Sequence, residues 1–425
     1  MYIVRTLSNG KLNFIEEEML GLSDISERFI IILFEDILPI WSTLGIDYVR
    51  GGFCECIASG GAIPEVTRRV RVSARQIYAF SQAAQLGYNP IVSTACIRHG
   101  YRFLEKHSSE HGLINHRISA DGTCLDAGYD LYDQAFLLFA CASAYRHLGD
   151  AAFRTRALTL LTSIRRHFGH VAGGFSNHTN KPFPLRSNPH MHLLEAALAW
   201  MTIDDDPAWE ELADEIVELF QSHFLDPVAG VVRELFTPDW VAIEEEGRYR
   251  VEPGHNYEWA WLLLRWHALT GGDVGGAPGS MINFAETNGY DPVRQVAINE
   301  CWSDGLTCDR NARLWPQTER LKAWLALAEA SRGLMRQQAE ARALDAARSL
   351  LGYLDRDTAR GLWRDVMLED GTFQAGAAPA SSLYHIICAL SELSDYVREA
   401  DRLLPDMEGT PAPAFLVNPS MELPA

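Results

Sequence analysis

The stretch EPGHNYEWAWLL, residues 252–263, places an imidazole and a carboxylate at the start of an apolar segment. Pro253 and Gly254 are typical of a helix start, and the aromatic run that follows predicts a buried helix. His255 and Glu258 then lie one turn apart on the same helix face. Histidine accepts and donates protons near neutral pH, and a carboxylate beside it orients the ring and favours its protonated form. The pair therefore indicates an acid–base site, and the structural alternative is a histidine that only satisfies a buried helix end.

Five other apolar segments also begin with polar side chains. Removing such groups from water costs free energy unless they are paired, so their presence at several helix starts favours a shared cavity. Each also has an ordinary explanation, because Arg75 could pair with Asp133 and the aromatic rings could belong to the core. The site residues predicted from these segments are Arg75, Tyr132, Asp133, Asn188, His192, Trp315, Glu319 and His385, and Arg71 precedes Arg75 by one turn.

Metal binding is the less favoured interpretation of the histidines. His190 and His192 are two residues apart and point to different sides of a helix, whereas helical metal ligands usually sit four residues apart or come from converging elements. The eight cysteines are scattered without a CxxC pair, which favours reduced thiols. We therefore expect no metal and no other cofactor.

A loose motif, in which a glycine precedes an apolar residue and a short polar stretch, recurs roughly every 60 residues. The apolar spacing between copies predicts two helices per interval, with the even-numbered helices inside because they are richer in small and aromatic residues. Such pairs predict a closed ring, and an open helical solenoid is the alternative. The marker glycines are Gly52, Gly112, Gly174, Gly230, Gly305 and Gly361; the predicted helices span 14–46, 66–87, 90–106, 128–148, 150–168, 187–203, 206–224, 255–270, 279–289, 315–333, 335–354 and 379–396.

Bulk properties limit the classes of partner. The 425 residues carry a net charge of −19, which argues against nucleic acid because phosphate binding needs clustered basic residues. No stretch approaches the roughly 18 consecutive apolar residues of a membrane helix, and the N-terminus lacks signal-peptide order. We expect a cytoplasmic protein with one domain over 1–425, an extended tail from about residue 404, a small-molecule ligand and possibly a homo-oligomeric state.

Taken together, the stretches RVSARQIYAF, DLYDQAF, NPHMHLLEA, EPGHNYEW, LWPQTERLKA and SLYHI resemble the N-acylglucosamine 2-epimerase superfamily, and specifically its aldose–ketose isomerase branch. The resemblance implies an (α/α)6 barrel of twelve helices with short β-hairpin-like loops at one mouth. It also implies catalysis by His255 and His385 without metal or nucleotide. The substrate-binding residues that it implies are Arg75, Tyr132, Asn188, His192 and Glu258, with Trp315 as an aromatic floor; Asp133 and Glu319 fit their motifs.

The expected reaction interconverts D-mannose and D-fructose through a cis-enediolate. We expect His385 to act at carbon and His255 to open the sugar ring, with Glu258 orienting His255. A sugar 2-epimerase acting on cellobiose, mannose or N-acylglucosamine is the nearest alternative. More remote are a glycoside hydrolase that uses Asp133, Glu258 or Glu319 and a non-catalytic binding module. The motifs contain no extra basic cluster that demands an anionic sugar.

Overall fold

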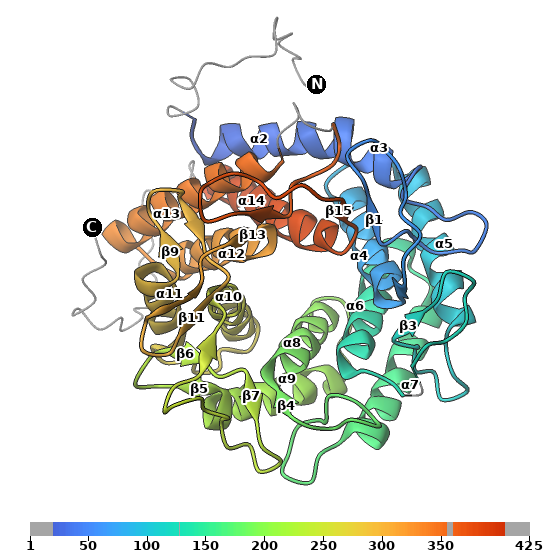
Figure 1. Ribbon diagram of the computed structural model, residues 1–425, viewed down its shortest axis with the longest axis horizontal. Coiled ribbons are helices and arrows are strands. Elements are labelled where there is room, and N and C mark those ends of the chain that lie inside the picture. The colour runs from blue at the N-terminus through green and yellow to red at the C-terminus, as the bar shows by residue number, and fades with distance from the viewer. Residues whose placement is uncertain (1–19, 127, 355–359, 404–425) are drawn as a thin grey trace, which may run out of the picture.

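The computed structural model describes residues 20–126, 128–354 and 360–403, which form an inner and an outer ring of helices (Figure 1). Each outer helix packs on an inner one. The inner helices are α4 (Arg71–Gln85), α6 (Leu131–Leu148), α8 (Ser187–Met201), α10 (Pro253–Thr270), α12 (Leu314–Ala330) and α14 (Ser382–Leu403). The outer helices are α5 (Pro90–Lys106), α7 (Ala151–Phe168), α9 (Pro207–Leu219) continued by η2 (Phe220–Phe224), α11 (Ala277–Asn288), α13 (Gly333–Tyr353), and the composite of α2 (Leu22–Ile32), η1 (Leu33–Ile37) and α3 (Leu38–Trp41).

The ring closes where α14, from the end of the chain, packs against α4. Successive inner helices contact one another around the whole ring, and α2 covers α14 from the outside (Figure 1). A solenoid would leave its first and last repeats without this contact. The prediction of an all-α (α/α)6 barrel is confirmed, and the open solenoid is wrong.

Apolar patterning explains which helices lie inside. In α6 every residue from Asp133 to Ala144 is buried, as expected of a helix surrounded by protein on all sides. The outer α7 buries residues such as Phe153, Ala157 and Ile164 at helical spacing, and its other face is exposed to solvent. The inner and outer assignment made from sequence is therefore confirmed for these helices.

Short antiparallel ladders connect the repeats at one mouth of the barrel. A strand before an inner helix pairs with a strand that precedes the next inner helix, so the ladders also run around the ring. These pairs are β2 (Arg68–Arg69) with β3 (Arg117–Ile118), β4 (Leu185–Arg186) with β7 (Leu235–Phe236), β8 (Arg250–Val251) with β11 (Glu300–Trp302), β13 (Ala312–Arg313) with β14 (Val366–Met367), and β15 (Ala378–Pro379) with β1 (Cys56–Ile57). Further hairpins pair β5 (Leu225–Asp226) with β6 (Val231–Val232), β9 (Tyr290–Asp291) with β10 (Val296–Ala297), and β11 with β12 (Thr307–Asp309).

The recurring glycine of the sequence motif has a backbone cause. All six marker glycines adopt positive φ, a conformation that costs other L-residues free energy. The fifth marker, however, is misplaced. The hairpin β9–β10 corresponds to β5–β6, and Gln295 (φ 58°) occupies the position of Gly230 (φ 69°), while Gly305 turns the additional β11–β12 hairpin. A left-handed residue need not be glycine, so the glycine pattern alone selected the wrong loop.

Buried polar side chains in the first turns of five inner helices bind the backbone of a loop at the mouth. Gln317, for example, accepts a hydrogen bond from the Ala297 N–H and donates one to the Ala297 carbonyl. These bonds fix each helix start against a mouth loop, which holds the neighbouring side chains in place. The five residues are Gln76, Gln134, His190, Asn256 and Gln317.

Helix boundaries differ from the prediction mainly where strands adjoin. The predicted helix 66–87 begins at Arg71 because β2 precedes it, and the predicted helix 379–396 begins at Ser382 because β15 precedes it. The first predicted helix, 14–46, contains a π-helical segment next to Pro39, which has no N–H to donate to an α-helical ladder. Residues 14–19 of that prediction and the predicted tail from 404 lie outside the described residues. Within the described ranges, no helix is long and apolar enough to cross a membrane.

Candidate active site

The first turns of the inner helices meet at the mouth that carries the ladders. Gly254 permits one decisive contact there, because a Cβ at this position would lie 2.4 Å from the Trp315 ring. The indole can therefore lie against the start of α10. The ring centroid of Trp315 is 5.2 Å from that of His255 and 5.8 Å from that of His385. Both imidazoles therefore lie beside the same indole ring.

His255 is held by a carboxylate that the sequence did not indicate. Its Nδ1 lies 2.8 Å from Oε1 of Glu234, with Oε1 of Glu252 at 3.7 Å. Burial alone would lower the pKa of His255, but Glu234 and then Glu252 outweigh it and raise the pKa to about 10. The prediction that Glu258 orients His255 is wrong, because the carboxylate on the β6–β7 loop reaches Nδ1 instead.

The protonated state of His255 also defines its contact with Asn188. The His255 Nε2 lies 3.0 Å from the Asn188 amide nitrogen, and the buried Asn188 Oδ1 has no hydrogen-bond partner among the described residues. A protonated imidazole donates from both nitrogens, so the amide oxygen is the natural acceptor, in the orientation that exchanges the amide O and N. That exchange also gives the buried oxygen its hydrogen bond.

His385 has the opposite electrostatic environment. Its Nδ1 lies 2.8 Å from Oε1 of Glu319, and the other oxygen of Glu319 lies 2.6 Å from the buried Lys322 ammonium. Burial, followed by the positive charges of Arg75 and Lys322, holds the pKa of His385 well below its ordinary value. With Nδ1–H donated to Glu319, the neutral ring has a lone pair on Nε2. His385 can therefore accept a proton under conditions in which His255 can donate one.

His192 is a buried neutral ring beside the predicted tyrosine. Its centroid lies 4.7 Å from that of Tyr132, and its Nδ1 lies 3.0 Å from Oε2 of Glu195. Burial lowers the pKa of His192 to about 4, despite the opposing effect of Glu195. Tyr384 donates a hydrogen bond to the other oxygen of Glu195.

Glu258 is a fully buried carboxyl whose Oε1 lacks a hydrogen bond among the described residues. It lies 3.9 Å from Nδ1 of His192. Burial, followed by the negative charge of Glu319, raises the pKa of Glu258 well above its ordinary value. These surroundings favour the protonated form of Glu258, which lies beside His192 and is not the hydrogen-bond partner of His255.

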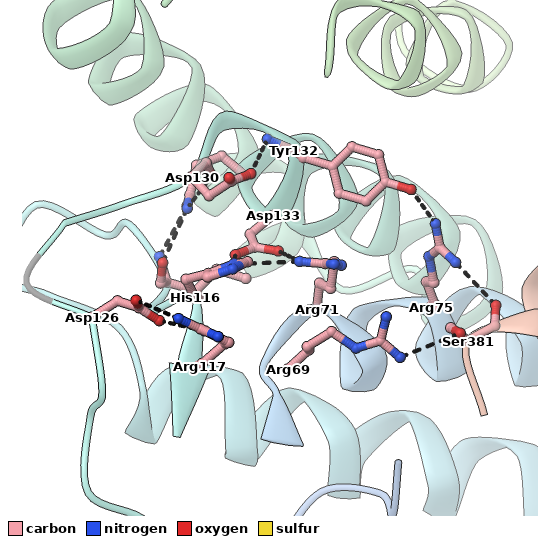
Figure 2. Close-up of polar contacts among 12 residues, drawn as sticks. Arg69, Arg71, Arg75, His116, Arg117, Asp126, Asp130, Tyr132, Asp133 and Ser381 are labelled. Atoms are coloured by element: carbon pink, nitrogen blue, oxygen red, sulfur yellow. Dashed lines mark hydrogen bonds and ion pairs between the residues drawn. The ribbon is translucent and has the colours of Figure 1, made fainter. Parts of the chain in front are cut away.

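Arg75 is not paired with Asp133, so that alternative is wrong. Figure 2 shows its guanidinium between the Tyr132 hydroxyl and the Ser381 carbonyl, with Nη1 to the carbonyl oxygen at 3.1 Å. Its Nε is buried without a partner in the described part of the chain. Asp133 instead binds Arg71. The cation of Arg75 thus lacks a carboxylate partner among the described residues and is suited to an oxyanion.

Two residues have structural contacts of their own. His190 Nε2 accepts from the Phe175 N–H and its Nδ1 faces the Arg186 carbonyl, so it is fully engaged with backbone and lies apart from His192. Asp133 is completely buried behind the mouth residues that it binds. The prediction that His190 and His192 point to different sides is confirmed.

Four groups of described residues have the donor types that a divalent cation takes, with ligand atoms within 4.8 Å of one another. Two stand apart: His116, Asp130 and Asp133, and Glu234, Glu252 and His255. The other two overlap: His192, Glu195 and Glu258, and Glu258, Glu319 and His385. Both oxygens of Glu319 already bind cationic or N–H donors, and Lys322 supplies the local positive charge. The two overlapping groups therefore form a hydrogen-bonded network in which the lysine occupies the place of a cation.

Sequence reasoning missed several of these groups. Lys322 was detectable, because a lysine three residues after Glu319 in an otherwise apolar helix must be paired. Tyr384 directly precedes His385 in the quoted SLYHI stretch. Glu234 had no comparable signal, since it lies in a loop and meets His255 only in the folded chain. All eight cysteines are unpaired.

Known proteins resemble this chain in sequence and in architecture. The chain is 38% identical over 366 residues to a mannose-6-phosphate isomerase of Rhizobium meliloti, covering 85% of this chain and 94% of that protein. A crystal structure of D-mannose isomerase superposes with a TM-score of 0.78 at 20% identity, covering 87% of this chain and 98% of the other. Cellobiose 2-epimerase from Spirochaeta thermophila gives a TM-score of 0.77 at 23% identity, with 89% and 98% covered.

The structural likenesses, at these identities, establish the fold alone, whereas the sequence comparison extends through the active-site segments. The model of the N-acylglucosamine 2-epimerase family matches residues 51–389, from the first mouth loop to the turn after His385. This range includes every residue of the site described above. The chain belongs to the N-acylglucosamine 2-epimerase family.

Proposed function

We propose that the protein is an aldose–ketose isomerase for a sugar with the mannose skeleton, in which His385 is the base at carbon and His255 is the acid. The observation that carries this proposal is the contrast between two imidazoles beside Trp315: His255 contacts two carboxylates, whereas the carboxylate bound to His385 is shared with the Lys322 ammonium. Carboxylates around His255 raise its pKa to about 10, and burial with two nearby cations lowers that of His385. Near neutral pH one ring therefore holds a proton while the other can accept one.

The reaction begins with ring opening, in which the ring oxygen gains a proton and the O1 hydroxyl loses one. In the open aldose, Nε2 of His385 removes the proton from C2. The C–H electrons form the C1–C2 double bond, and the carbonyl π electrons move to O1. Arg75 stabilises the resulting oxyanion, and His255 supplies its proton. Transfer of the O2 proton to His255 and return of the proton from His385 to C1 give the ketose and restore both histidines to their starting states.

Two substrates of this skeleton have support. D-mannose is favoured by 28% identity over 240 residues to the D-mannose isomerase of Thermobifida fusca, and mannose 6-phosphate by the 38% identical mannose-6-phosphate isomerase of Rhizobium meliloti. Both reactions use the same carbons, so the proposed roles of the histidines apply to either. The alternative 2-epimerase reaction needs a proton removed from one face of C2 and returned to the other.

The test is incubation of purified protein with D-mannose or D-mannose 6-phosphate in deuterated water. An isomerase yields fructose or its 6-phosphate, whereas a 2-epimerase yields glucose or its 6-phosphate. Exclusive formation of the gluco product would refute the isomerase proposal in favour of epimerisation. Failure to convert either sugar would refute both substrates.

The residue roles are tested with His255→Ala and His385→Ala. Each variant should lose at least roughly 100-fold in kcat, within the range of acid–base groups. His111→Ala, at a partly exposed ring on an outer loop, is the matched control and should retain wild-type activity. Near-normal turnover by either active-site variant would contradict the role assigned to that histidine.

A further inference from the structure

One side of the mouth holds a cluster of basic side chains that a neutral hexose does not require. Arg71 and Arg75, both on α4, flank the Tyr132 ring, with guanidinium carbons 5.0 and 5.6 Å from its centroid. His116, from the loop before α6, lies next to Arg71 (Figure 2). The sequence alone showed no such cluster, because His116 is far from the arginines along the chain.

Arg71 and His116 share one hydrogen-bonded carboxylate among the described residues. Oδ1 of Asp133 lies 2.7 Å from Nη1 of Arg71, and Oδ2 lies 2.6 Å from Nδ1 of His116. The same Arg71 and His116 nitrogens approach within 3.3 Å of each other. Asp130 lies close by, with a carboxylate oxygen within 4.8 Å of the His116 and Asp133 ligand atoms, and burial followed by Asp133 raises its pKa to about 6. Asp133 therefore fixes the positions of both basic groups.

Donor groups remain available after these contacts. Within the described residues, Nε and Nη2 of Arg71 and Nε2 of His116 make no hydrogen bond, and their side chains are 16% and 21% exposed. Arg68 and Arg69 on the adjacent strand differ, because each pairs with its own carboxylate, Asp47 or Glu55. Among these basic side chains, the available donors of Arg71 and His116 thus lie in the part of the mouth next to Tyr132.

The position of the cluster suits the end of the sugar that does not react. His255 and Trp315 begin α10 and α12, whereas Arg71 and His116 lie at α4 and the loop before α6, across the ring of inner helices (Figure 1). Arg75 lies between them, bound to Tyr132 and to the start of α14. A sugar whose C1 and C2 face the histidines can direct its C6 toward this cluster.

We propose that Arg71 and His116 form a phosphate subsite that binds the 6-phosphate of an aldose substrate. This inference rests on the proposed isomerase function and specifies its substrate class. The planar guanidinium and the imidazole N–H donate charge-assisted hydrogen bonds, which suit the phosphate oxygens. Asp133, behind both groups, orients them without reaching the ligand.

The test compares D-mannose 6-phosphate with D-mannose in wild type and variants, and measures binding of inorganic phosphate by calorimetry. His116→Asn removes one donor. The double variant Arg71→Gln with Asp133→Asn removes the other donor together with its buried partner, so no uncompensated carboxylate remains. Arg117→Gln is the matched control, since Arg117 is half exposed and binds Asp126 beside the cluster (Figure 2).

Wild type should bind phosphate and prefer the phosphorylated sugar. Each of the two variants should raise KM for mannose 6-phosphate about tenfold or more, the effect of a charged hydrogen bond, with less than about twofold change for mannose. The control should match wild type. Equal effects on both sugars, or no phosphate binding, would overturn the subsite while leaving isomerisation of free mannose intact. If neither sugar reacts, the isomerase proposal fails, and the calorimetry still decides whether the subsite exists.

Discussion

Replacement of Glu234 by glutamine tests the electrostatic basis of the proposed mechanism. Glu234 makes the shortest contact to His255, with Oε1 2.8 Å from Nδ1, and is the leading cause that raises the ring's pKa to about 10. Glutamine keeps the size and one hydrogen-bond acceptor but removes the charge. A hydrogen bond to a charged group contributes about 1.5–3 kcal/mol, and one pKa unit corresponds to about 1.4 kcal/mol. The pKa of His255 should therefore fall by about 1–2 units in Glu234→Gln.

The assay is the pH dependence of kcat/KM for the sugar that wild type converts. The acidic limb reports protonation of the base and the alkaline limb reports loss of the acid's proton. Wild type should stay active until the pH approaches about 10, because His255 keeps its proton up to that range. In Glu234→Gln the alkaline limb should move to lower pH by about 1–2 units. Glu244→Gln, at an exposed loop carboxylate, should leave the profile unchanged.

Stability gives a second measurement with a defined sign. The folded pKa of His255 is above its unfolded value of about 6.5, so its stabilisation is fully present below that pH. The contribution is lost as the pH rises through about 10. Glu234→Gln should have a lower free energy of unfolding than wild type near neutral pH. Between neutral pH and pH 10, that free energy should decrease less in the variant than in wild type. An alkaline limb that stays at the wild-type position would refute the assignment of His255 as the acid set by Glu234.

Two further substitutions test the groups around the histidines. Lys322→Met leaves the buried Glu319 without its ammonium and should cost about 3–5 kcal/mol in urea unfolding; it should also move the acidic limb of kcat/KM to higher pH, because the lysine charge lowers the pKa of His385. An unshifted acidic limb in a folded variant would contradict this electrostatic role. Gly254→Ala places a Cβ 2.4 Å from the neighbouring indole and should lower kcat/KM by displacing that ring, whereas Gly60→Ala, which meets nothing within 4 Å, should behave like wild type in the same assay. Equal activity of the two glycine variants would show that the indole position is not critical.

The helices that carry the site could be predicted because their signals are local. The apolar runs after His255 and Tyr132 indicate buried helices, and polar side chains in those first turns mark the end that faces the cavity. The predicted helix boundaries differ from the structure where a strand adjoins the helix, since a two-residue strand such as β2 has no periodicity of its own. Its pairing partner, β3, is supplied by a distant part of the chain.

Carboxylate partners were harder to assign than helices. Glu258 is one turn from His255 and was the natural candidate, yet the structure turns it toward His192 and places Glu234 on the ring. Spacing along a helix shows which side chains share a face. It does not show which loop residue covers that face from another element.

The repeat shows the same division between local and tertiary information. Gly230 marks its hairpin because a left-handed residue is most easily a glycine. In the next repeat Gln295 takes the same conformation, and only the pairing of β9 with β10 identifies it. The left-handed conformation of Gln295 depends on the β9–β10 pairing around it, and the spacing of residues along the sequence does not show that pairing.

The amino-acid sequence by itself determined the helices, their inner and outer faces, the ring of repeats and the residues that line one mouth. These properties depend on hydrophobic periodicity and helix-start chemistry, which act over a few neighbouring residues. The tertiary structure alone decided which carboxylate raises the pKa of His255, which lysine and arginine lower the pKa of His385, and that His116 joins Arg71. Electrostatic interactions act through space between segments that the fold brings together, so the charges that define the chemistry cannot be read from their order along the chain.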